Sequence, residues 1–165
     1  MGQLVEHTFL PVWSPESEVL ILGTIPSPKS RENGFYYGHP QNRFWRVVAG
    51  VLGEPVPEGN RAKEQFCLRR HIALWDVLAA CEIEGAADAT IRRPQANDIA
   101  GLLQKTRVRA VFTTGAKAHA LYQRHCLPQT GVEDIPLPST SPANARFSLE
   151  RLIAAYRPLG EALGG

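Results

Sequence analysis

The sequence predicts an α/β fold, a three-layer sandwich in which a central, mainly parallel four-stranded sheet is flanked by helices. Two observations predict it. Short apolar runs of strand length alternate along the chain with segments whose apolar residues recur at helical spacing. The chain has 165 residues, of which 44% are hydrophobic, so it can bury the core of one domain that spans residues 1–165.

The first predicted strand and the first predicted helix lie on either side of a long polar segment. Residues 18–24 contain the apolar run VLIL and are expected to form a buried strand. Apolar residues recur at helical spacing from Phe44 to Leu52, and Gly53 supplies a stop signal, so we expect a helix there. Residues 53–60 contain two prolines and two glycines and are expected to form a turn rather than a domain boundary.

Three further strands are predicted in the rest of the chain. Residues 72–75 begin the second strand, residues 108–113 form the third, and residues 134–138 lead into a short fourth. The passage between the second strand and Asp98 is polar and is expected to be irregular. These strands complete the predicted sheet.

Capping residues and helical spacing predict the remaining helices. Asp98 can cap a helix that precedes the third strand, and residues 116–126 are expected to form a helix after it. Ser148 can cap the last helix, which Pro158 should end or kink.

The composition excludes several classes of protein. No apolar run reaches the length of a membrane span, and the first residues lack the pattern of a signal peptide, so we expect a cytoplasmic protein without a membrane partner. The cysteines, Cys67, Cys81 and Cys126, have no zinc-site spacing and are one short of the set that an iron–sulfur cluster takes. No metal or other cofactor is therefore expected, and P-loop and nucleophile-elbow motifs are missing as well.

The loop between the first strand and the first helix is the most informative part of the sequence. Residues 23–45 read GTIPSPKSRENGFYYGHPQNRFW and combine basic and hydroxyl side chains with three successive aromatics and a His-Pro-x-Asn turn. Such a loop can bind phosphates and stack on a flat ring. The net charge is only +2, but basic residues gather here, which favours salt-sensitive contact with a polyanion.

A second loop, residues 139–144, reads STSPAN and follows the fourth predicted strand. In parallel α/β sheets, ligands bind outside the carboxyl ends of the strands. Both loops leave such ends, so we expect them to converge on one cleft.

The first loop resembles the first motif of the uracil-DNA glycosylase superfamily. It is most similar to the hypoxanthine-DNA (deoxyinosine) glycosylase branch, with the pattern G-[ST]-x-P-S-x-x-S-R followed by F-Y-Y-x-H-P-x-N-x-F-W. Mismatch-specific uracil glycosylases carry a water-positioning Asn where this chain has Ile25. The STSPAN loop resembles the late motif of the superfamily, in which a Ser-Pro loop enters the minor groove. The resemblance covers about residues 19–156.

The resemblance implies roles for three residues of the first loop. Asn42 is the implied catalytic residue, whose amide would accept from and donate to the attacking water; otherwise it caps the following helix. Tyr37 is implied to stack on the flipped base, unless it only covers the sheet edge. His39 either contacts the departing base or a phosphate, or simply shapes the turn. Phe35 and Tyr36 are expected to be packing residues.

Further contacts are expected from both loops, although a Ser-rich loop with proline is by itself unremarkable. Ala143 stands where some relatives insert a bulky wedge, so Asn144 or Arg146 is a candidate to fill the emptied stack. Asp76 faces the cleft or, alternatively, is an exposed turn or capping residue. The other expected substrate contacts are Ile25, Pro26, Ser139, Ser141 and Asn144, and the expected DNA contacts are Ser27, Lys29, Ser30, Arg31, Arg43, Thr140, Pro142 and Ala143.

The resemblance implies a monofunctional DNA glycosylase of base excision repair. Such an enzyme excises a deaminated base, hypoxanthine first of all, from double-stranded DNA and leaves an abasic site. The nucleotide must leave the stack, since its glycosidic carbon is inaccessible in a duplex. We expect a monomer acting on DNA with a damaged or mismatched base. Two alternatives stay open, a mismatch-specific uracil or thymine glycosylase and a non-catalytic α/β protein that binds damaged DNA or nucleotides.

Overall fold

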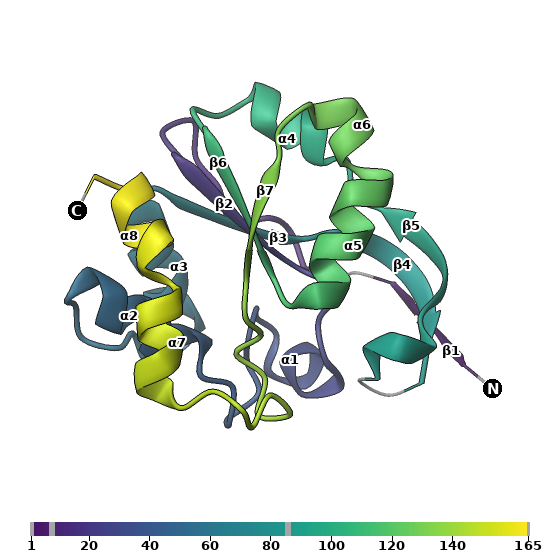
Figure 1. The fold of residues 1–165 in the computed structure, drawn as a ribbon, viewed down its shortest axis with the longest axis horizontal. Coiled ribbons are helices and arrows are strands. Elements are labelled where there is room, and N and C mark those ends of the chain that lie inside the picture. The colour runs from purple at the N-terminus through teal and green to yellow at the C-terminus, as the bar shows by residue number, and fades with distance from the viewer. Residues whose placement is uncertain (1, 7–8, 85–86, 165) are drawn as a thin grey trace.

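The structure, a computed structural model, describes residues 2–6, 9–84 and 87–164, without the side chains of Pro28, Lys29 and Asp88. A four-stranded parallel sheet in the order β3-β2-β6-β7 forms its centre (Figure 1). Its strands are β2 (Val19–Gly23), β3 (Ile72–Asp76), β6 (Ala110–Thr114) and β7 (Asp134–Leu137). All four lie at or within a few residues of the predicted positions.

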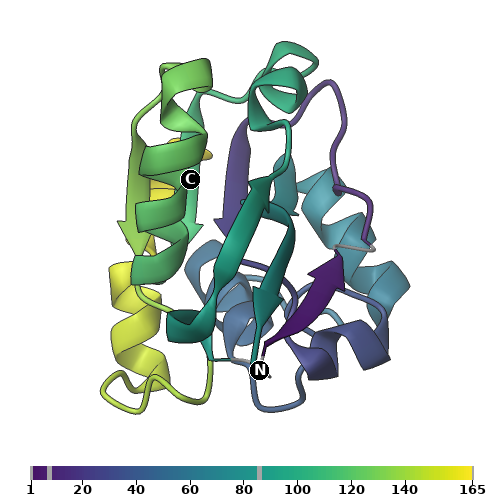
Figure 2. The same ribbon diagram turned by 90° about the vertical axis from the view of Figure 1, so that its right-hand side faces the viewer.

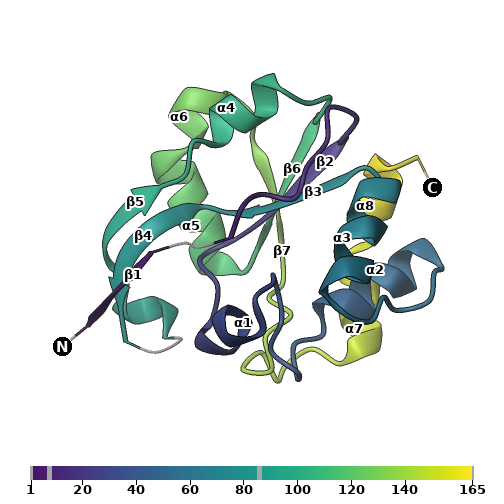
Figure 3. The same ribbon diagram turned by 180° about the vertical axis from the view of Figure 1, so that it is seen from behind.

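Helices cover both faces of this sheet (Figures 1 and 3). One face carries α2 (Phe44–Leu52), α3 (Asn60–Arg69), α7 (Leu149–Ala155) and α8 (Arg157–Ala162). The other carries α4 (Ile99–Gln104), α5 (Ala116–His125) and α6 (Leu127–Thr130). The prediction of a three-layer α/β sandwich with a parallel central sheet is confirmed.

The alternation of side chains along β2 explains why both faces are covered. Successive residues of a strand point to opposite faces. Val19 and Ile21 belong to the core under α2, α3, α7 and α8, whereas Leu20 and Leu22 belong to the core under α4 and α5. All four are fully buried. A continuous apolar run of this kind is what a strand buried on both faces requires.

The predicted irregular passage before Asp98 is wrong, because most of it forms a second sheet. Strands β1 (Gln3–Glu6), β4 (Leu78–Ile83) and β5 (Arg92–Ala96) pair antiparallel in the order β1-β4-β5, and the short helix η1 (Asp88–Thr90) lies between β4 and β5 (Figure 2). The sequence of β5, RRPQA, has no apolar alternation. As an edge strand paired only to β4, it tolerates a proline and remains polar.

Three α-helices, α1, α3 and α6, were also absent from the sequence prediction. The first loop contains α1 (Pro28–Asn33), which Ser27 caps by accepting a hydrogen bond from the Ser30 amide. The polar helix α3 buries only Phe66 and Cys67, so its periodic signal is weak. The predicted caps at Asp98 and Ser148 are confirmed, since their side chains accept from the amides of Gly101 and Arg151.

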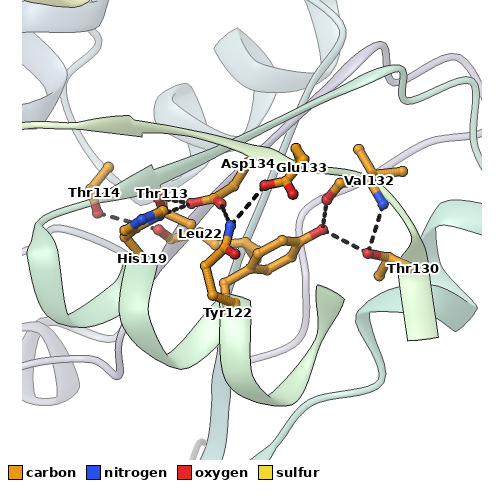
Figure 4. A network of polar contacts seen from close by, with 10 residues as sticks. Leu22, Thr113, Thr114, His119, Tyr122, Thr130, Val132, Glu133 and Asp134 are labelled. Atoms are coloured by element: carbon orange, nitrogen blue, oxygen red, sulfur yellow. Dashed lines mark hydrogen bonds and ion pairs between the residues drawn. The ribbon is translucent and has the colours of Figure 1, made fainter. Parts of the chain in front are cut away.

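A polar network fixes β7, the strand that leads into the STSPAN loop (Figure 4). The buried carboxylate of Asp134 accepts from Thr113 Oγ1 at 2.6 Å and from Gln123 Nε2 at 2.7 Å, and His119 Nδ1 lies 2.7 Å away. Burial acts to raise the pKa of Asp134, but these hydrogen bonds outweigh it and hold the pKa below its ordinary value. The network therefore joins β7 to β6 and α5.

Across the described residues, every helix is too short or too polar to cross a membrane.

Candidate active site

A cavity of about 340 Å³ opens at the carboxyl ends of the parallel strands. Its volume lies in the range of small-molecule sites. Helix α1, the turn before α2 and the loop after β7 gather at this end of the sheet (Figures 1 and 3). Both loops line the cavity, so their predicted convergence is confirmed. The first loop contributes Gly23, Thr24, Ile25, Pro26, Ser27, Ser30, Tyr36, Tyr37, His39 and Asn42. The STSPAN loop, residues 139–144 and called the late loop below, contributes Ser139, Ser141, Pro142 and Ala143, and other strands contribute Asp76, Ile83 and Thr114.

Asn42 lies at the start of α2 and lines the cavity. Its Oδ1 accepts two hydrogen bonds, from the Phe44 amide at 2.9 Å and from Thr140 Oγ1 at 2.7 Å. Both acceptor positions of an amide oxygen are then used. Asn42 stabilises the helix start with its oxygen and also faces the cavity, so this geometry is compatible with both sequence interpretations. The expected acceptance of a hydrogen bond from water does not fit this geometry.

Tyr37 forms part of the cavity wall beside Asn42. Its ring stacks on Phe44, with centroids 3.8 Å apart and planes 9° from parallel, and its hydroxyl lies 3.2 Å from Thr114 Oγ1. Burial, with a smaller contribution from the negative charge of Asp76, raises the pKa of Tyr37 well above its ordinary value. The phenol therefore stays neutral. Its φ of 52° lies in the left-handed region, and the chain forms a turn at Tyr36 and Tyr37.

His39 presents one ring nitrogen to the chain and lines the cavity. Its Nδ1 accepts a hydrogen bond from the Gln41 amide at 3.0 Å. In a neutral imidazole whose Nδ1 is an acceptor, the proton is on Nε2. His39 can therefore offer a donor in this tautomer.

Asp76, left open between cleft and turn in the sequence, is 4% exposed and lines the cavity from the end of β3. It pairs in register with Gly23 at the end of β2. A Cβ on residue 23 would lie 2.5 Å from Oδ1 of Asp76 and 3.2 Å from the Tyr37 hydroxyl, so only glycine leaves room for both groups. The signal that pointed to Asp76 was its place directly after an apolar strand. Thr114, at the end of β6, was missed altogether.

The late loop is held from both ends. Tyr156 donates from its hydroxyl to the Pro138 carbonyl at 2.5 Å, and Asn144 donates from Nδ2 to the Ser139 carbonyl at 2.9 Å. The Asn144 amide thus closes the loop, and Asn144 is not part of the cavity lining, so its substrate contact stays a prediction. Ser139 and Ser141 do line the cavity, as do Pro142 and Ala143.

Arg43 stabilises this loop through its guanidinium group. Its guanidinium donates to the carbonyls of Ser141 at 3.1 Å and Asn144 at 2.9 Å, and also to the Phe147 carbonyl. These contacts join the start of α2 to residues about a hundred positions later in the chain. The two terminal nitrogens of Arg43 therefore bind the protein's own carbonyls, and its phosphate contact stays a prediction.

Helix α1 and its cap contain four of the predicted DNA contacts, Ser27, Lys29, Ser30 and Arg31. Ser30 is 3% exposed, and its hydroxyl accepts from Ser27 Oγ and from the Gly38 amide, so it stabilises the loop; its phosphate contact stays a prediction. Ser27 caps the helix and borders the cavity. Arg31 is partly exposed and donates to the Pro26 carbonyl at 2.8 Å. The side chain of Lys29 lies outside the described residues.

The geometry is that of an α/β protein with a cavity at the carboxyl edge of its parallel sheet. The profile of the Uracil DNA glycosylase superfamily matches residues 10–159. A hypoxanthine DNA glycosylase from Methanosarcina acetivorans is 36% identical over 150 residues, which cover 90% of this chain and 94% of that protein. A hypoxanthine DNA glycosylase from Methanosarcina barkeri is 34% identical over 139 residues, which cover 84% and 87%.

A solved structure agrees with these matches. The solution NMR structure of a candidate uracil DNA glycosylase from Methanosarcina acetivorans superposes with a TM-score of 0.79 at 34% identity, covering 96% of this chain and 99% of that one. The chain belongs to the uracil DNA glycosylase superfamily. The predicted superfamily, and with it the prediction of a DNA glycosylase that hydrolyses N-glycosyl bonds, is confirmed.

Proposed function

We propose that this protein is a monofunctional glycosylase that excises hypoxanthine from double-stranded DNA and leaves an abasic site. It acts as a monomer built as a single domain. Two relatives of 34% and 36% identity, each covering most of the chain, are hypoxanthine DNA glycosylases. The thiols of Cys67, Cys81 and Cys126 are buried and form no disulfide among the described residues, in keeping with a reducing cytoplasm.

The observation that carries the proposal is the buried carboxylate of Asp76 in the cavity. Hypoxanthine carries a ring N1–H, whereas adenine carries an acceptor at N1. A carboxylate accepts from N–H and repels a lone pair, so Asp76 favours the deaminated base. Asp76 lies at the end of β3, in register with Gly23 at the end of β2, and it lines the cavity that would receive the base.

The rest of the cavity suits a base that has left the helix. Tyr37, braced by Phe44, provides a flat wall, while His39 and Asn42 add polar groups. Excision breaks the bond between C1′ and N9 with the electron pair moving to the base, and water then adds to C1′. Among the described side chains, no lysine lines the cavity, which supports hydrolysis by water rather than a Schiff-base intermediate.

The proposal is tested by incubating the protein with duplexes that carry one inosine, uracil, xanthine or ethenocytosine, followed by alkali. We expect strand scission at inosine, dependent on alkali because the enzyme has no lyase step. Release of uracil without hypoxanthine would support the mismatch-specific alternative. Binding to damaged duplexes without release of any base would overturn the proposal.

A further inference from the structure

The amide of Asn42 has a defined orientation. The atom 2.9 Å from the Phe44 amide must be oxygen, because a backbone N–H can only donate. Thr140 donates to the same oxygen at 2.7 Å, which occupies its second acceptor position. The NH₂ group therefore makes no hydrogen bond within the described part of the chain, although Asn42 lines the cavity. Asn42 can act toward a ligand as a donor only.

Thr140 is itself immobilised. Its side chain is 1% exposed, and its main-chain carbonyl accepts from the Arg43 amide at 3.1 Å. Asn42 and Arg43 thus bind the side chain and the main chain of one residue on the late loop. The Arg43 guanidinium holds the carbonyl of the neighbouring Ser141. A rigid partner of this kind defines the rotation of the Asn42 amide more closely than the helix start alone.

We propose that Thr140 is a positioning residue for base excision, and that Asn42, oriented by it, donates from Nδ2 to the departing base. This inference rests on the proposed function. Negative charge develops on the base as the electron pair of the C1′–N9 bond moves to N9. An N–H donor directed at that charge stabilises the transition state without strengthening ground-state binding. Water adds to C1′ and passes its proton to the departing base or to solvent.

The first test compares Thr140→Val with Thr140→Ser in single-turnover excision of inosine. Valine keeps the shape and removes the donor, so the rate should fall about tenfold, the effect of losing one hydrogen bond in the transition state. Serine restores the donor and should recover most of the rate. Thr130→Val is the matched control. It removes a hydroxyl that bonds Tyr122 and the Val132 amide at a distance from the cavity, and excision should be unchanged.

A double-mutant cycle shows whether Thr140 acts through Asn42. In an Asn42→Ala background, Thr140→Val should cost nothing further in excision, since the amide it orients is gone. Thermal unfolding of each variant separates this from a loss of folded protein. An equal fractional loss in both backgrounds, or a wild-type rate for Thr140→Val, would overturn the positioning role.

The pH profile of Asn42→Asp tests the donor role. Aspartate can keep both bonds to Phe44 and Thr140, but then directs a carboxylate oxygen at the base. The donor role predicts a slow enzyme that speeds up as pH falls from 8 to 5, because protonation restores a donor. A rate that falls over the same range would mean that the residue serves water as an acceptor, and the donor assignment would fail. A wild-type protein that excises no base overturns the proposed function itself, a result distinct from either failure.

Discussion

Replacing Asp76 examines the contact that gives the cavity its proposed base preference. A hydrogen bond to a charged group contributes about 1.5–3 kcal/mol. If the buried Asp76 carboxylate accepts from N1–H of hypoxanthine, Asp76→Ala should reduce kcat/KM for inosine by about 10- to 150-fold. Asp76→Asn keeps an acceptor oxygen but not the charge, so its loss should be smaller.

The assay that isolates this contact varies the base as well as the protein. N1-methylhypoxanthine has no N1–H, so the wild-type enzyme should excise it at least tenfold more slowly than hypoxanthine. Asp76→Ala should remove that preference, because neither base then has its acceptor. Unfolding temperatures serve as the control for misfolding. The reasoning is refuted if Asp76→Ala slows both bases alike and preserves their ratio, since the carboxylate would then act on the sugar or on the fold.

Four further substitutions follow from the same geometry. Arg31→Ala should reduce the slope of log DNA affinity against log salt concentration by about one, with little effect on stability. Arg43→Ala removes the bonds to the late-loop carbonyls, so it should lower the unfolding free energy by about 2 kcal/mol and leave the salt slope unchanged. Equal salt slopes for the two variants would contradict this distinction. Gly23→Ala should slow excision at least tenfold, because its Cβ would displace Asp76 or Tyr37, and a wild-type rate would argue against that crowding. Asp134→Asn should cost about 2 kcal/mol at pH 7, measured by denaturant unfolding. The pKa of Asp134 is lowered in the folded protein, so its stabilising contribution is complete above the unfolded pKa of about 4 and is lost as pH falls through the folded pKa. The difference in unfolding free energy between wild type and Asp134→Asn should therefore disappear in acid.

The sequence was sufficient for the parts of the fold that are buried on both faces. The run VLIL of β2 is fully buried, so its apolar composition is a direct consequence of its position. Strand β5 carries no such signal, because its residues are mostly exposed and its place depends on pairing with β4. The helix α3 was missed for the same reason, having only two buried residues in ten. Where burial is slight, tertiary pairing decides the structure and local pattern does not.

The site likewise contains residues that a local motif predicts and a residue that only tertiary pairing brings in. Asn42, Tyr37 and His39 lie within one contiguous motif, and the cavity brings them together as the motif predicts. Asp76 enters through the register of β2 against β3, which places it beside Gly23 across fifty residues of chain. A single aspartate after a strand is equally typical of a cap or a turn, so no local pattern distinguishes these roles. The pairing of the ends of β2 and β3 distinguishes them, because it places Asp76 in the cavity.

The assignment of Arg43 shows why a motif cannot define the use of each of its residues. Its position in a basic segment predicted a phosphate ligand, yet its donors bind carbonyls of the late loop. The same loop supplies Thr140, which takes the second acceptor position of Asn42. Two adjacent residues of the first motif therefore contact the same loop. The guanidinium of Arg43 maintains the shape of the loop, and Thr140 of the loop orients the amide of Asn42. A change in the late loop should consequently alter how Asn42 meets the base without touching Asn42 itself, and the chemistry of the first motif is defined only once the second is folded against it.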